Sequence, residues 1–109
     1  MPWLVREGEV LATLEVADGA RARAKGLLGQ DGFEGAILLR PAKSVHTLGM
    51  RFAIDVAFID DDMVVLRTVT MRRWRLGRVV RRAAGVIEAE AGAFATWNLQ
   101  VGDVLEIKG

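Results

Sequence analysis

Four polar residues lie near the middle of the chain: His46, Thr47, Arg51 and Asp55. Their side chains are of types that can bind a charged ligand or transfer a proton. An arginine guanidinium can fork onto a carboxylate or a phosphate, and a histidine can exchange a proton near pH 7. A structural alternative also fits, in which His46 and Thr47 satisfy backbone groups at a bend while Arg51 and Asp55 pair with neighbours. A lone histidine without a serine, cysteine or second acid at motif spacing is weak evidence for catalysis.

Glu88 and Glu90 form a second candidate set, because residues two apart on a strand point to the same face. Paired carboxylates could serve glycoside hydrolysis, and together with Asp55 they could supply oxygen ligands to a metal ion. We expect the plainer arrangement, in which the two glutamates lie on the wet face of an edge strand or balance nearby arginines. No metal site is therefore assigned, and Glu88 stays a candidate member of the central polar patch.

The third candidate is a run of six arginines within residues 72–82, with Trp74 among them. Such a run could follow a phosphate backbone while the indole stacks on a base, and its candidate contacts are Arg72, Arg73, Arg75 and Arg78. The whole chain carries a net charge of only +1 at pH 7, however, whereas nucleic-acid domains usually carry a larger excess. We therefore expect a solvated loop or internal ion pairs, and nucleic acid is not the expected partner.

Several kinds of chemistry are absent from the composition. With no cysteine, the chain has no disulfide, no thiol nucleophile and no cysteine-ligated metal. With one histidine and no tyrosine, it has no multi-histidine metal site and no phenolic acid–base group. The three aspartates at 60–62 lack the spacing and the glycine of a calcium loop, so they are expected to turn a hairpin. No glycine-rich phosphate-binding motif occurs, and no cofactor is assigned.

The element expected to position the central patch is a hairpin. Within residues 51–59 the even positions are large and apolar, while the odd positions 51, 53, 55 and 57 are small or charged. This period of two predicts a strand with one face in a core. The aspartates then turn the chain, and residues 63–71 are predicted to return as the second strand.

Further apolar segments predict strands at 9–16, 35–39, 86–90 and 104–107, and short helices at 20–28 and 92–99. Residues 72–82 fit neither period and are expected to form an exposed loop.

The chain has 109 residues, 51% of them hydrophobic, which suits one globular domain spanning residues 1–109. Many short strands with little helix predict a mainly β fold, either a small sandwich or a partly closed barrel.

The sequence resembles the family named domain of unknown function 192, which consists of small stand-alone bacterial and archaeal proteins. The most specific match is residues 44–60, Ser-Val-His-Thr-Leu-Gly-Met-Arg-Phe-Ala-Ile-Asp-Val-Ala-Phe-Ile-Asp, with weaker matches at 23–28, 35–39, 86–92 and 99–103. The resemblance implies a jelly-roll-like β-sandwich with one or two short helices, and it implies no established activity. Relatives often carry proline at the position of Ala53 and glycine at that of Met63, so a ligand specific to one subgroup does not transfer.

We expect a binding module that holds a small polar or anionic ligand, or a partner protein, through His46, Thr47, Arg51, Asp55 and Glu88. One alternative is a small hydrolase or isomerase with His46 as base and Asp55 or Glu88 as acid or orienter, and this alternative requires His46 within reach of a carboxylate. Another is polyanion binding through the arginine run. No signal peptide and no apolar stretch of about 20 residues is present, so we expect a cytoplasmic monomer or weak homodimer without a membrane partner.

Overall fold

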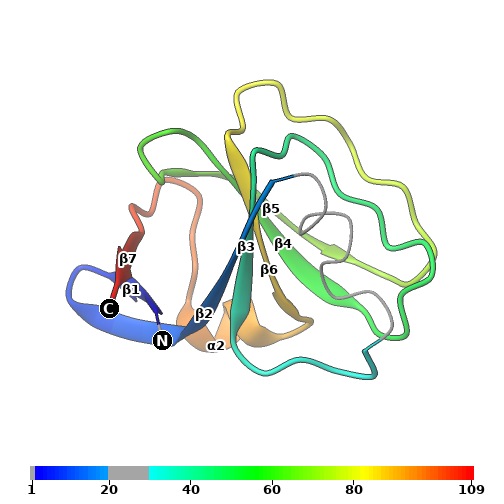
Figure 1. Cartoon of the computed structure of the whole chain (residues 1–109), viewed down its shortest axis with the longest axis horizontal. Helices are drawn as coiled ribbons and strands as arrows, with labels where there is room; N and C mark the ends of the chain where they lie inside the picture. Colours follow the sequence, from blue (N-terminus) through cyan, green and yellow to red (C-terminus); the bar gives the residue numbers. More distant parts are fainter. Residues whose placement is uncertain (1, 20–29) are drawn as a thin grey trace.

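The computed structural model describes residues 2–19 and 30–109. This part of the chain contains one hydrogen-bonded sheet with the strand order β5-β4-β6-β3-β2-β1-β7, and β5 and β7 are its two edges (Figure 1). The sheet is therefore not closed into a barrel. The elements are β1 (Trp3–Arg6), β2 (Glu9–Asp18), β3 (Ala36–Arg40), β4 (Ile54–Ile59), β5 (Val65–Met71), β6 (Gly85–Glu90), α2 (Ala93–Trp97) and β7 (Glu106–Lys108).

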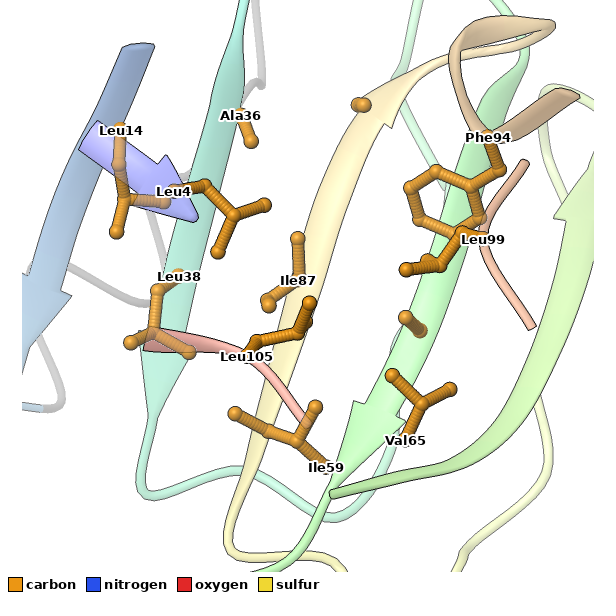
Figure 2. Packing of buried hydrophobic residues seen from close by; sticks show 12 residues of the cluster. Leu4, Leu14, Ala36, Leu38, Ile59, Val65, Ile87, Phe94, Leu99 and Leu105 are labelled. Carbon is orange, nitrogen blue, oxygen red and sulfur yellow. The ribbon is translucent and has the colours of Figure 1, made fainter. Parts of the chain in front are cut away.

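The long strand β2 joins two parts of the sheet. Its first half pairs with β1 in antiparallel fashion, and its second half pairs with β3 in parallel from Leu14 opposite Ala36 onward. The β1–β7 pair and α2 therefore cover one face of β3, β6 and β4. The first core lies there, where Leu4 and Leu105 meet Leu38 and Ile87 (Figure 2).

A second core lies on the opposite face of the same strands. Its members from the sheet include Ile37 of β3, Val56 and Phe58 of β4 and Val86 of β6. Residues 42–52 and 72–83 cover this face, and they pair with each other as an irregular ribbon. The backbone amides of Gly77 and Val80 donate to the carbonyl oxygens of Val45 and Lys43, and that of Thr47 donates to Arg75.

The expected hairpin is confirmed, with β4 antiparallel to β5 and Asp60 at its turn. Two details differ from the sequence expectation. β4 begins at Ile54 rather than at residue 51, and all six of its residues are buried. The expectation of a single buried face was wrong because the two cores cover both faces, so the small Ala57 packs in the first core while Phe58 packs in the second.

The remaining elements agree with a mainly β fold. Strands occur at each of the other four predicted segments, the helix expected at 92–99 is α2, and residues 72–82 form a largely exposed loop. The helix expected at 20–28 lies outside the described residues. None of the described helices is long and apolar enough to cross a membrane.

Candidate functional site

Asp55, in β4, is buried and used structurally. One carboxylate oxygen accepts a hydrogen bond from the Thr70 hydroxyl at 2.6 Å, and the other accepts from the backbone amides of Gly92 and Phe94 at 2.9 and 3.1 Å. The carboxylate therefore satisfies amides that the first turn of α2 would otherwise leave free. With both oxygens engaged, Asp55 ties β4 to β5 and α2.

Thr47 is fully buried and links the two strands of the ribbon. Its hydroxyl donates to the Arg72 carbonyl at 2.5 Å and accepts from the Arg75 amide at 2.8 Å. The neighbouring His46 is exposed, and its Nδ1 accepts from the Leu48 amide at 3.3 Å. The hydrolase alternative requires a carboxylate within hydrogen-bond reach of His46. No carboxylate among the described residues lies within hydrogen-bond or ion-pair reach of it.

Arg51 lies on the surface before β4 begins, where its guanidinium forms an exposed ion pair with Asp31 at 3.0 Å. This ion pair and the contacts of Asp55, Thr47 and His46 match the structural alternative, in which the four side chains bond to neighbouring parts of the protein. The structure therefore does not gather these four side chains around one hollow in the described part of the chain.

Glu88 is in an unusual position for a carboxylate. It lies in β6, opposite Ile37 of β3 and Val56 of β4, which both belong to the second core. Only 5% of its surface is exposed, and no described residue donates a hydrogen bond to it. Burial raises the pKa of Glu88 to about 7, because the apolar surroundings disfavour the charged form.

The expectation that Glu88 would lie on the wet face of an edge strand, or balance arginines, was wrong. β6 is an inner strand of the sheet, covered on both faces, and Glu88 forms no ion pair in the described chain. Glu90 is exposed and accepts from the Phe33 amide at 3.3 Å. Asp55 faces the first core and Glu88 the second, so these two carboxylates do not share a site.

The arginine run forms the most distinctive surface of the described chain. Arg72, Arg73, Arg75, Arg78, Arg81 and Arg82 are all exposed, and none of them forms an ion pair with a described residue. Trp74, Leu76 and Val79 lie between them with 61%, 77% and 66% of their surfaces exposed. Internal pairing, one of the two arrangements expected from the sequence, is not what this loop shows.

A hollow of about 440 Å³ lies between this loop and strand β5, and we call it the arginine groove. Arg67 of β5 contributes from one side and Arg72, Arg75 and Arg78 of the loop from the other. Phe58, Val69 and Met71 contribute the apolar side chains of the sheet, and no acidic residue lines the groove. A second hollow of about 420 Å³ continues past Arg67 and Arg78 to Arg81 and Arg82.

Sequence reasoning did not identify Arg67 as a site residue, because a single arginine within a β-strand carries no motif. The register of β5 is the signal that could have found it. Arg67 stands opposite Phe58 and Val69 opposite Val56, so both face the side on which the following arginine loop returns.

The comparisons with known proteins agree on family and fold. The family model described as "Uncharacterized ACR", which is the domain of unknown function 192 family, matches residues 3–107. The chain belongs to this family. A UPF0127 protein of Pyrococcus abyssi is 30% identical over 105 residues, covering 92% of this chain and 86% of the relative. A UPF0127 protein of Pyrococcus horikoshii is 29% identical over 105 residues, with 92% and 88% covered.

Two solved structures share the fold. A protein of unknown function from Novosphingobium aromaticivorans has a TM-score of 0.79 at 16% identity, covering 96% of this chain and 82% of its own. A Sinorhizobium meliloti protein, for which a role in transcription regulation is suggested, has a TM-score of 0.81 at 19% identity, with 96% and 90% covered. At these identities the likeness extends to the fold and not to the activity.

Proposed function

We propose that this member of the family is a binding module that holds an anionic ligand in the arginine groove. The observation that carries the proposal is the placing of four guanidiniums from two elements around an apolar floor, without an acidic residue in the lining. Guanidinium groups recognise carboxylates and phosphates through paired, charge-assisted hydrogen bonds. In the described chain these groups have no internal counter-charge, so an external anion is the partner that their chemistry fits.

The size of the groove supports the same proposal. At about 440 Å³, the groove falls within the range of roughly 300–1,000 Å³ that is usual for ligand sites. Val69 and Leu76 would contact an apolar part of the ligand while the guanidiniums hold its charge. This site replaces the central patch as the place where we expect binding, because the contacts of Thr47, Arg51 and Asp55 are already used within the protein.

The test is retention on immobilised heparin, used as a generic anion, by the parent protein and by two double variants. Arg75→Gln with Arg78→Gln removes two guanidiniums of the groove. Arg40→Gln with Arg51→Gln removes the same net charge from exposed arginines that pair with Asp18 and Asp31. We expect the groove variant to elute at lower salt than the parent and the control variant. Equal elution of the two variants would show that retention depends only on the net charge of the protein, and it would exclude the groove as the anion site.

A further inference from the structure

The arginine groove runs beside a free strand edge. β5 is the outermost strand of the sheet and, among the described strands, pairs only with β4. Within the described chain, Val65 bonds Gly102 and Asp103 through its backbone, whereas residues 66–70 have no strand on their outer side. The open edge is therefore about 17 Å long. Such an edge presents unpaired backbone donors and acceptors that an added strand can use.

The groove includes this edge. Arg67, Val69 and Met71 face the second core, whereas Thr70 faces the opposite way and bonds Asp55, and all four line the groove. A segment lying along the edge would therefore contact the guanidiniums and the apolar floor together. Because alternate residues of an extended chain point to opposite sides, a segment with an acidic residue at every second position would direct all its carboxylates to the face that carries the guanidiniums.

The charges along the strand favour a short acidic peptide over a phosphate chain. Asp60, Asp61 and Asp62 come just before β5, and Asp60 and Asp61 line a separate hollow with Asp18. A nucleic-acid backbone extended past Val65 would meet these carboxylates, whereas a peptide as short as the open edge would not. Arginine side chains also line a second hollow, which shares Arg67 and Arg78 with the first. The two hollows together are longer than one small anion.

We infer that the arginine groove takes a short acidic segment of another protein, bound in extended conformation as an added strand on β5. The inference rests on the proposed anion-binding function and specifies its ligand. Backbone hydrogen bonds to β5 would fix the direction and register of the segment, and the guanidiniums would select acidic side chains.

The probe is a synthetic peptide of about five residues, which matches the open edge in length, capped at both ends, with alternating glutamate and valine. Binding is followed by titration calorimetry at low salt, because screening weakens exposed charge pairs. Two further peptides carry N-methyl groups on alternate residues, one set on the glutamates and one on the valines. Inorganic phosphate, a lysine–valine peptide and a single-stranded oligothymidylate complete the series.

We expect the acidic peptide to bind, and the Arg67→Gln, Arg75→Gln double variant to bind it at least about tenfold more weakly, because this variant lacks two of the four guanidiniums that would bond its carboxylates. The Arg40→Gln, Arg51→Gln control should bind it like the parent. One N-methylated peptide should lose binding and the other keep it, because only alternate residues of an edge strand bond to its neighbour. A circular dichroism spectrum of each variant verifies its fold.

Four results would overturn the inference. Equal binding of both N-methylated peptides would exclude strand addition. Tighter binding of the oligothymidylate than of the acidic peptide would identify a nucleic acid as the ligand. Binding of phosphate that depends on Arg75 and Arg78, without binding of the peptide, would refute the inference while the proposed function stands. If no anion in the series binds, the proposed function fails as well.

Discussion

Glu88 is the residue whose chemistry depends most on the fold around it. Its side chain is 5% exposed and lies beside Ile37 and Val56, and no described residue donates a hydrogen bond to its carboxylate. These apolar surroundings disfavour the charged form, which is less well hydrated there than in water. The folded protein therefore favours the neutral acid, with a pKa of about 7 against 4.5 for an ordinary glutamate.

This difference predicts how stability depends on pH. Between pH 4.5 and about 7, folded Glu88 keeps a proton that the unfolded chain releases. The free energy of unfolding should therefore fall by about 1.4 kcal/mol per pH unit across this window as a result of Glu88. In Glu88→Gln the loss of stability from pH 5 to pH 8 should be smaller than in the parent by roughly 2–3 kcal/mol.

Urea denaturation of the two proteins at both pH values measures this difference. The matched control is Glu90→Gln, which removes the same charge from an exposed glutamate two residues away. Parallel curves of stability against pH for the parent and Glu88→Gln would show that Glu88 titrates normally in the folded protein.

The element that matters most for the candidate site is the ribbon formed by residues 42–52 and 72–83. It has few regular strand pairs, and Thr47 connects its two halves. The Thr47 hydroxyl and backbone hold Arg72, Trp74 and Arg75 through hydrogen bonds of 2.5–2.9 Å. Gly77 lets the loop approach the Val45 carbonyl and Met71 more closely than a residue with a Cβ atom could. The position of the groove arginines thus depends on the middle of the chain.

Thr47→Val tests this dependence. Valine keeps the shape of threonine but lacks the hydroxyl, so the Arg72 carbonyl and the Arg75 amide lose a buried partner. We expect the free energy of unfolding to fall by about 1–3 kcal/mol and amide hydrogen exchange in residues 72–80 to accelerate. Thr47→Ser keeps the hydroxyl and should remain closer to the parent in exchange. Equal exchange of the loop in both variants would show that the hydroxyl does not hold it.

The hairpin was predictable from the sequence because the two-residue period of 51–59 and the aspartate turn specify it locally. The position of β6 was not predictable, since neighbouring strands in the sheet are set by tertiary pairing, and this is why Glu88 was expected at a wet face. The exposed arginine loop was predicted from its composition. The arginine groove was not, because it depends on Arg67 of β5 facing a loop that returns under the sheet.

At the scale of the whole molecule, opposite charges occupy separate places on a nearly neutral protein. The net charge is +1, yet the groove contains four arginines and no acid, whereas Asp18, Asp60 and Asp61 line a different hollow together with Arg40. Net charge alone therefore underestimates the local attraction of anions to the loop. Under the proposed function, the arginine surface would attract anions at short range rather than over long distances.

This separation predicts a strong dependence of ligand binding on salt. Exposed guanidiniums interact with an anion across water, and the screening length shortens from about 30 Å at 0.01 M salt to about 8 Å at 0.15 M. The dissociation constant for the acidic peptide should therefore rise with sodium chloride concentration, and more steeply for the parent than for Arg75→Gln with Arg78→Gln. A dissociation constant unaffected by salt would indicate a mainly apolar contact with Val69 and Leu76.

The most direct test of the central claim, that the arginine groove is an anion site, is a nuclear magnetic resonance titration that observes the arginine Nε–Hε groups. Inorganic phosphate is added stepwise at constant ionic strength, with the resonances assigned by single Arg→Lys variants. The structure predicts saturable shifts of Arg67, Arg72, Arg75 and Arg78, with Arg40 and Arg51 unchanged in their pairs with Asp18 and Asp31. Shifts that are absent, or equal at the groove and control arginines, would contradict the claim.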